Sequence, residues 1–198
     1  IHGLITYMRT DSLRISAEAA DAAREFISEK YGEKYLPSQQ RVYKTRENAQ
    51  DAHEAIRPAD VTLEPENVKK YLSSGQYKLY KLIWSRFIAS QMSNAELDTV
   101  SVDILADKYI FRVNGSVLKF DGYMTVYKTD DGDDESEGSR LPDLKEGEVL
   151  SLDELIPTQK FTEPPPRYTE ATLIQFLEEK GIGRPSTYAP IISTIISR

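Results

Sequence analysis

The sequence predicts an α+β fold, with helical regions at both ends of the chain and antiparallel strands between them. Apolar residues recur at helical spacing before residue 94 and after residue 166, but with a period of two from Glu96 onward. Charge divides the chain at similar points: net +2 over residues 1–94, −10 over 95–157 and +1 over 158–198. We therefore expect a helical domain at 1–94, an antiparallel β domain at 95–165 and the beginning of a further helical domain at 166–198.

Three helices are expected in the first region. Ser16 is suited to cap a helix over residues 17–30 that Gly32 ends, and Pro65 is suited to open a helix over 65–73. A third helix is expected over 76–92, where Trp84 lies on a broad apolar face and is interpreted as a core residue. The polar stretch 34–50 is read as a long connection with a weak strand at 41–43.

The β region is expected to contain a hairpin. Residues 96–106 alternate in polarity, and the runs 109–113 and 116–120 flank Asn114-Gly115, a pair typical of a type I′ turn. Further strands are expected within 123–128 and 148–156. The segment TDDGDDESEG carries six carboxylates between Asp130 and Glu137 but fails the spacing of a calcium-binding EF-hand. We predict no metal site there and a mobile segment over 130–138.

The C-terminal region is expected to be helical after a stiff polyproline crossover at residues 164–166. Thr169 is suited to cap a helix over 170–180 that Gly181 ends. Ser186 or Thr187 would cap a last helix that accepts Pro190 in its first turn.

The composition excludes several classes of protein. The chain has no cysteine, which rules out disulfides, thiolate zinc sites and thiol catalysis and is compatible with a reducing cytoplasm. No run approaches the ~18 apolar residues of a membrane span, and no secretory signal is recognisable. We expect a globular protein with no membrane partner.

The strongest candidate for a reaction centre is the stretch LITYMRTDS, residues 4–12. Tyr7 ends an apolar run, and its phenol, which titrates near ~10 in isolation, needs a cation or a base to act as a nucleophile at neutral pH. Arg9 would project from the same face of an extended segment and could hold a phosphate oxygen, which suits phosphoryl transfer. The alternative is a half-buried strand tyrosine followed by a surface arginine.

Together with HEAIRP at residues 53–58 and GIGRPSTYAPII at 181–192, this stretch resembles the bacterial type IA DNA topoisomerases. The resemblance covers nearly the whole chain, and Met8 favours the topoisomerase I branch, since the topoisomerase III and reverse gyrase branches usually have proline there. It implies that the tyrosine cleaves one DNA strand through a 5′-phosphotyrosyl intermediate, that the other strand passes, and that religation relaxes negative supercoils.

The resemblance also implies roles for individual residues. Tyr7, Arg9 and His53 would be catalytic, with His53 holding the phosphate near the tyrosine. Glu54 and Arg57 are expected to support the site or the structure. The candidate DNA-binding residues are Thr10, Asp11, Arg57, Arg184, Ser186 and Thr187, of which the last three precede a helix N-terminus that could cradle a phosphate.

In this family Mg²⁺ and a catalytic lysine belong to a Toprim domain N-terminal to the tyrosine motif. We expect this chain to be a fragment without that domain, inactive alone and without a metal of its own. Its expected partner is DNA, chiefly single-stranded, in the bacterial cytoplasm at the nucleoid; its oligomeric state is left open.

Two other function classes remain as alternatives. The chain could be a structural arch or a protein-interaction module without its own catalysis. A recombinase or type IB topoisomerase is disfavoured, because the arginines and histidine of those enzymes precede the tyrosine, whereas here the tyrosine comes first.

Overall fold

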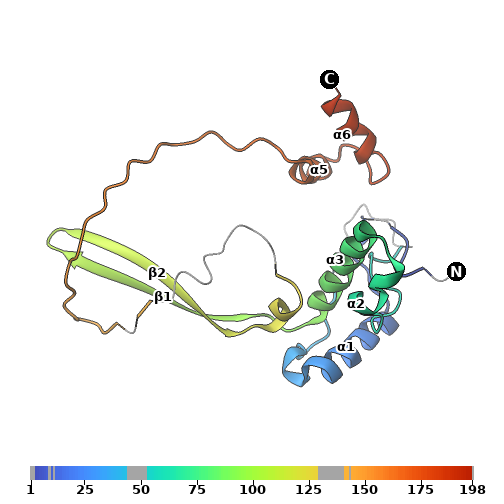
Figure 1. The fold of residues 1–198 in the computed structure, drawn as a ribbon, viewed down its shortest axis with the longest axis horizontal. Coiled ribbons are helices and arrows are strands. Elements are labelled where there is room, and N and C mark those ends of the chain that lie inside the picture. Colours follow the sequence, from blue (N-terminus) through green and yellow to red (C-terminus); the bar gives the residue numbers. More distant parts are fainter. Residues whose placement is uncertain are drawn as a thin grey trace. The chain divides into compact units, whose positions relative to one another are not determined.

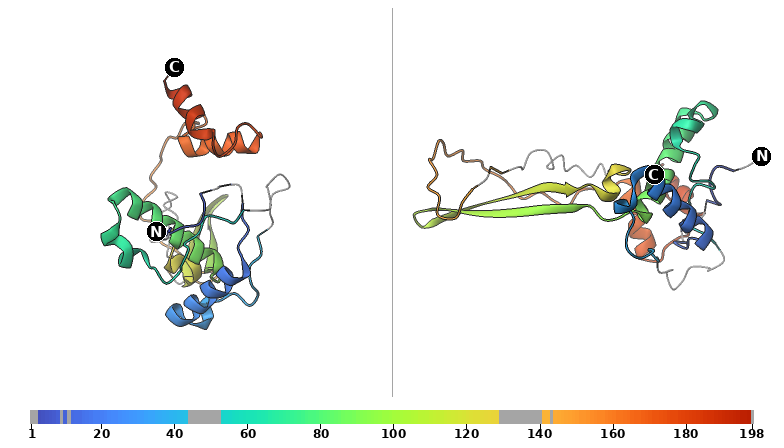
Figure 2. Two further views of the ribbon diagram at one scale, coloured as in Figure 1. Left: turned by 90° about the vertical axis from the view of Figure 1, so that its right-hand side faces the viewer. Right: turned by 90° about the horizontal axis from the view of Figure 1, so that it is seen from below.

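The computed structural model describes residues 3–8, 10, 12–43, 53–128, 141–142 and 144–197. The chain divides into two compact units, Ile1–Leu144 and Lys145–Arg198. The first unit holds a group of helices and a two-stranded antiparallel sheet, and the second holds two helices (Figures 1 and 2). The predicted α+β class is confirmed. The predicted mobile segment 130–138 lies outside the described residues.

Helix α1 (Ala17–Tyr31) begins and ends where the sequence predicts. The Ser16 side-chain oxygen accepts a hydrogen bond from the Ala19 N–H at 3.3 Å. Gly32 follows the helix with a φ of +95°, which glycine adopts without strain, and its N–H bonds the carbonyls of Ile27 and Ser28. A short 3₁₀ turn, η1 (Glu33–Tyr35), comes next.

The two following helices differ in detail from the prediction. The helix expected over 65–73 is a short α2 (Pro65–Val68) that tightens into the 3₁₀ turn η2 (Lys69–Tyr71). Helix α3 (Ser74–Gln91) begins before Gln76, because Ser73 and Gln76 form a reciprocal capping box that draws Gly75 into the first turn.

The core of the first unit lies between α1, α3 and the segment that precedes α2. Trp84 is buried, as predicted, and its indole N–H donates to the Val61 carbonyl at 2.9 Å. The Tyr80 hydroxyl donates to the Leu63 carbonyl at 2.6 Å, and burial together with the nearby Asp60 charge raises the pKa of Tyr80 to about 12. The buried cluster consists of Ala19, Ala23, Ile27, Val61, Val68, Tyr80, Trp84, Phe87, Ile88 and Met92.

The sheet is one long hairpin, β1 (Glu96–Ala106) and β2 (Tyr109–Phe120), that extends from the helical group (Figure 1). The turn predicted at Asn114-Gly115 is wrong: the chain reverses at Asp107-Lys108, and Asp107 has a φ of +55°. Asn114 instead lies within β2 opposite Ser101, whose hydroxyl donates to its side-chain oxygen at 2.8 Å. Turning at residue 107 lets all of β1 pair with β2, which a turn at residue 114 would prevent.

The other predicted strands are also wrong, because a strand needs a hydrogen-bonded partner. Residues 41–43 and 148–156 lie in no strand of the described chain. Residues 122–125 form the 3₁₀ turn η3 (Gly122–Thr125) in place of a strand. The Asp121 carboxylate stabilises this turn by accepting the hydroxyls of Tyr35 at 2.8 Å and Thr125 at 2.7 Å.

Turn η3 joins the hairpin to the helical group. The Tyr123 N–H donates to the Ser93 carbonyl at 2.9 Å, and the Ser93 N–H donates to the Tyr35 carbonyl at 2.7 Å. Gly122 has a φ of +47°, and a Cβ atom there would lie 2.4 Å from the Asn94 carbonyl oxygen. Only glycine fits at this junction without displacing the backbone.

The second unit contains α5 (Glu170–Glu179) and α6 (Tyr188–Ile196) after an exposed segment without regular structure. Thr169 caps α5 as predicted, through an exchange of hydrogen bonds with Thr172, and Gly181 follows with a φ of +68°. Thr187 precedes α6 but its side chain does not cap that helix; Pro190 lies in the first turn. No described helix of either unit has the length and apolar character needed to cross a bilayer.

Candidate active site

The site is built where two segments far apart in the sequence run side by side. Residues 4–6 pair in antiparallel fashion with residues 57–59 of the HEAIRP motif and its neighbour. The Thr6 N–H donates to the Arg57 carbonyl at 2.9 Å, and the Ala59 N–H donates to the Leu4 carbonyl at 2.9 Å. This pairing brings the tyrosine stretch and the histidine motif together.

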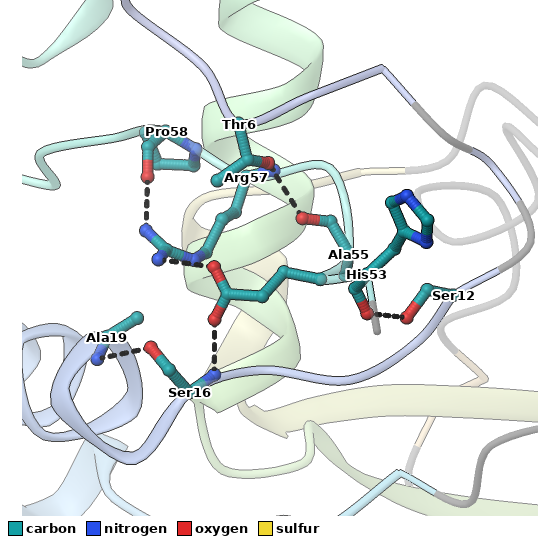
Figure 3. A network of polar contacts seen from close by, with 9 residues as sticks. Thr6, Ser12, Ser16, Ala19, His53, Ala55, Arg57 and Pro58 are labelled. Carbon is teal, nitrogen blue, oxygen red and sulfur yellow. Dashed lines mark hydrogen bonds and ion pairs between the residues drawn. The ribbon is translucent and has the colours of Figure 1, made fainter. Parts of the chain in front are cut away.

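Two hydroxyl side chains, those of Thr6 and Ser12, extend the connection at positions before and after Tyr7 in the sequence, and Figure 3 shows both. The Thr6 hydroxyl donates to the Ala55 carbonyl at 2.8 Å and accepts the Arg57 N–H at 3.0 Å. Beyond the tyrosine, the Ser12 hydroxyl donates to the His53 carbonyl at 2.5 Å. The segment that carries Tyr7 is therefore anchored to residues 53–57 before and after the tyrosine.

Tyr7 itself is 75% exposed. Its ring centroid lies 6.1 Å from that of His53, with the planes tilted by 33°. This exposure excludes the alternative of a half-buried strand tyrosine. A phenol held at the surface by an anchored segment is accessible to a substrate much larger than a metabolite.

His53 carries a buried ring nitrogen, Nδ1, that has no hydrogen-bond partner among the described residues. Buried polar atoms are normally paired, and an unpaired one costs free energy. The ring lies next to Tyr7, and the described residues around it leave its Nδ1 atom unpaired.

The neighbouring Glu54 and Arg57 form an internal ion pair (Figure 3). The Arg57 guanidinium donates to the Glu54 carboxylate at 2.8 Å and to the Pro58 carbonyl at 3.0 Å. The other Glu54 oxygen accepts the Ser16 N–H at 2.8 Å, which links the histidine motif to the start of α1. Only 15% of the Arg57 side chain is exposed, an arrangement that favours its structural role over contact with DNA.

Competing effects act on the Glu54 carboxyl group. Partial burial raises its pKa, but the hydrogen bonds from Ser16 and Arg57 and the Arg57 charge outweigh burial, so the pKa lies below its usual value. Glu54 is therefore ionised at neutral pH and available to both of its partners.

The other predicted site residues are distributed as follows. Thr10 is exposed near Tyr7 in the chain, whereas Arg9 and Asp11 lie outside the described residues. Arg184, Ser186 and Thr187 are exposed and belong to the second compact unit.

In that second unit a tight turn precedes α6. The Thr187 hydroxyl accepts the Arg184 N–H at 2.8 Å and donates to the Arg184 carbonyl at 3.0 Å. The Arg184 guanidinium donates to the Gly183 carbonyl at 3.0 Å. Thr187 is thus engaged with the backbone, which leaves Arg184 and Ser186 as the more accessible candidates for phosphate contact.

Thr6 and Ser12 are the supporting residues that sequence reasoning missed. Their signal was present, since hydroxyl residues flank the tyrosine in ITYMRTDS, but their partners are carbonyls more than forty positions away. Among the described residues no group of three or more His, Asp or Glu side chains could hold a metal ion.

Comparison with known proteins identifies the class. The chain belongs to the DNA topoisomerase family, whose model matches residues 1–198. The two relatives described next are named DNA topoisomerase 1 and topoisomerase I, which confirms the resemblance drawn from the three motifs. It is 51% identical over 200 residues to DNA topoisomerase 1 of Rickettsia bellii (strain RML369-C), covering 99% of this chain and 25% of that protein.

A solved structure supports the same relationship. The full-length topoisomerase I of Thermotoga maritima is similar with a TM-score of 0.79 and 39% identity, covering 98% of this chain and 30% of that one. The chain thus spans between a quarter and a third of the length of these relatives.

Proposed function

We propose that these residues carry the strand-cleaving tyrosine of a type IA topoisomerase, a DNA isomerase. The single observation that carries the proposal is Tyr7, exposed beside His53 on a segment anchored at both ends to the histidine motif. Its substrate would be DNA, chiefly single-stranded, because the surface of residues 1–94 is close to neutral and suits placed contacts in a groove better than a broad basic stripe.

In the proposed reaction the Tyr7 phenol loses its proton and its oxygen attacks a backbone phosphorus atom. A bond forms between the tyrosine oxygen and phosphorus, and the bond from phosphorus to the 3′ oxygen breaks. The 3′ oxygen leaves with a proton as a free hydroxyl, and the 5′-phosphate stays on Tyr7. Religation is the reverse step, and it needs no external energy because one phosphodiester replaces another.

The neighbouring residues serve this step through position and charge. Negative charge develops on the phosphate oxygens during attack, and donors placed there stabilise the transition state. His53 is suited to this role because its ring lies beside that of Tyr7, with the centroids 6.1 Å apart. Arg9 would supply a fixed positive charge and a fork of donors. Thr6, Ser12 and Glu54 would hold the segments that carry the reacting groups.

Mg²⁺ is expected from the family resemblance. We assign the ion to none of the described residues, among which no group of three or more His, Asp or Glu side chains could hold it, and no part of the proposed step is routed through it. When bound, such an ion would supply positive charge close to the phosphate. The site of action would be the bacterial cytoplasm, at the nucleoid.

The test is covalent trapping with the complete gene product that carries these residues. A single-stranded oligonucleotide labelled at its 3′ end is incubated with the protein, so that the label stays on the fragment whose 5′-phosphate would join Tyr7. The adduct is isolated after denaturation. Tyr7→Phe should abolish the adduct and leave strand binding nearly unchanged, since the ring remains and only the nucleophile is lost. Tyr43→Phe, at a partly exposed tyrosine of the same unit, serves as the matched control.

A 5′-phosphotyrosyl adduct on Tyr7→Phe would mean that another residue is the nucleophile. Absence of any adduct in the unaltered protein would favour the alternative of a structural arch or interaction module. One observation favours that alternative, namely the hairpin, whose large apolar side chains are exposed at Leu105, Tyr109 and Ile110.

A further inference from the structure

A hollow with a concentration of lysines lies away from the Tyr7 site. It has a volume of about 460 Å³ and lies between one face of α3 and the turn η3 with the residues that follow it. Its lining residues are Lys78, Lys81, Leu82, Ser85, Met124, Thr125, Val126, Tyr127 and Lys128. We call this hollow the lysine groove.

The α3 wall follows from helical spacing. Residues 78, 81, 82 and 85 fall on one helical stripe, so two ammonium groups share a face with Leu82 and the buried Ser85. The opposite wall contains a third lysine, Lys128, which is forty-seven positions beyond Lys81 in the chain. All three lysines are exposed.

The charge of this hollow is unusual in an acidic chain of net charge −7. Of the nine described lining residues, three are lysines and none carries a carboxylate. Outside the groove, the pKa of Glu66 is lowered by a hydrogen bond from Tyr77 and by the charges of Lys69 and Lys81. Lys78 and Lys81 lie three positions apart on α3, where like charges repel, and a bound anion would relieve that repulsion.

An arginine and an aromatic ring extend the groove. The Arg86 guanidinium lies over the Tyr127 ring, 5.4 Å from its centroid, and its Nη1 atom is 3.4 Å from the Tyr127 hydroxyl. This stacking holds Tyr127 against α3 and adds a fourth positive charge beside the groove. The rim therefore combines several cations with a fixed ring, as grooves that follow a nucleic-acid backbone do.

We propose that the lysine groove binds the phosphodiester backbone of a nucleic acid strand at a place separate from the strand cleaved at Tyr7. Lysines on flexible stems suit this ligand, because they neutralise phosphates without demanding one geometry or one base sequence. The choice of nucleic acid as the ligand rests on the proposed function; the site itself rests on the groove and its charge.

The test compares two triple variants of the complete gene product that carry the same change in charge. Lys78→Gln, Lys81→Gln and Lys128→Gln are combined in the groove variant. Lys70→Gln, Lys108→Gln and Lys119→Gln are combined in the control, at positions that do not line the groove. Binding of a fluorescent single-stranded oligonucleotide is measured by anisotropy over a series of salt concentrations.

Each lost phosphate contact on a single strand should lower the slope of log affinity against log salt by about 0.7. The groove variant should therefore lose about 2 from the slope, and the control should match the unaltered protein. Acetylation of lysines, read by mass spectrometry, should show Lys78, Lys81 and Lys128 protected by the oligonucleotide. Equal slopes for both variants, or no protection, would overturn the proposal.

Two further measurements distinguish failure of the groove proposal from failure of the proposed Tyr7 mechanism. A synthetic peptide TDDGDDESEG, the sequence of residues 129–138, tests for an acidic polypeptide ligand; protection of the groove lysines by the peptide alone would contradict a nucleic-acid site. Adduct formation is measured on the same samples. An adduct in the unaltered protein with equal slopes in both variants refutes the groove alone, whereas a slope difference without any adduct refutes the Tyr7 mechanism alone.

Discussion

At the residue scale, the candidate chemistry depends on one exposed phenol and one partly buried imidazole. Tyr7 is free to meet a substrate, while the Nδ1 atom of His53 is buried without a partner among the described residues. Reaction at the phenol builds charge that His53 and Arg9 would stabilise. The phenol is the group that reacts and its neighbours are helpers, so their removal should have different consequences.

We expect His53→Ala and Arg9→Ala to slow cleavage rather than abolish it. Removing one donor that stabilises transition-state charge typically costs about 10²-fold to 10³-fold in rate. The measurement is the rate of adduct formation on a labelled single-stranded oligonucleotide by the complete gene product. His2→Ala is the matched control for His53, since it removes the one other histidine of the chain. An unchanged rate in His53→Ala would remove the histidine from the mechanism.

The lowered pKa of Glu54 predicts how the free energy of unfolding changes with pH. Its pKa is lowered in the folded state, so its contribution to stability is present at neutral pH and is lost as the pH falls below its usual value of 4.5. Glu54→Gln should reduce the free energy of unfolding by about 1–3 kcal/mol at pH 7, because it removes charged hydrogen bonds to Ser16 and Arg57.

This prediction is tested by urea unfolding at pH 7 and at pH 3.5. The difference between Glu54→Gln and the unaltered chain should shrink at the lower pH, because there the Glu54 carboxyl of the unfolded chain binds a proton more readily than the folded carboxylate does. Glu18→Gln, at an exposed acidic residue in the first turn of α1, is a suitable control. A difference that grows on acidification would contradict the assigned direction of the pKa.

At the element scale, the junction between the hairpin and the helices depends on a position that only glycine can occupy without displacing the backbone. Gly122 combines a φ of +47° with a carbonyl where its Cβ would be. Around it, the Asp121–Tyr35 side-chain bond connects η3 to η1, and backbone bonds of Ser93 connect both turns to the end of α3. The position of β2 relative to α3 therefore depends on a few contacts near residue 122.

We expect Gly122→Ala to destabilise the first unit strongly, by about 3 kcal/mol or more, because a clash with backbone adds to the strain of a positive φ. Gly75→Ala is the matched control: nothing lies within 4 Å of its Cβ position, and it is in a helix, where alanine is favoured by up to about 1 kcal/mol. Thermal unfolding followed by circular dichroism measures both. Equal melting temperatures for the two variants would refute the role of Gly122.

At the scale of the whole molecule, the chain is two compact units with candidate DNA contacts in each. Tyr7 and His53 belong to the first unit, and Arg184 and Ser186 to the second. The family relatives are three to four times longer than this chain, so the proposed reaction is one that these units would perform within a larger protein.

We therefore expect the purified 198-residue chain not to relax negatively supercoiled plasmid, and its DNA binding not to require Mg²⁺. The reason is the family resemblance, which assigns the metal and a catalytic lysine to a domain that precedes the tyrosine motif. Gel electrophoresis of plasmid topoisomers, with and without Mg²⁺, measures relaxation, and the complete gene product is the positive control. Relaxation by the 198-residue chain would show that these residues are sufficient for catalysis.

Local patterns predicted those features whose causes are local. The ends of α1 and α5 were predicted to within one residue because a serine or threonine cap and a following glycine act within a few residues. The start of α3 was predicted less well, since the capping box of Ser73 and Gln76 was not recognised. The burial of Trp84 followed from the helical spacing of its apolar neighbours.

The hairpin turn shows the limit of such patterns. Asn114-Gly115 is the stronger turn signal in isolation, yet the chain turns at Asp107-Lys108. The choice depends on the summed pairing of two whole strands, which exceeds the preference of any dipeptide. In the segment expected as a strand, residues 122–125 instead form η3, where the Asp121 carboxylate accepts the hydroxyl of Tyr35, a residue of the distant turn η1.

For the site, the sequence by itself determined which chemical groups are present and, through three motifs, the family to which the chain belongs. Only the tertiary structure decided which groups meet. It brings His53 beside Tyr7, engages Arg57 with Glu54, and anchors the tyrosine segment through Thr6 and Ser12. These contacts join residues about forty to fifty positions apart, and spacing along a chain specifies neighbours only within a helical turn or a strand pair. Backbone pairing between residues 4–6 and 57–59 creates the proximity, and no local preference encodes it.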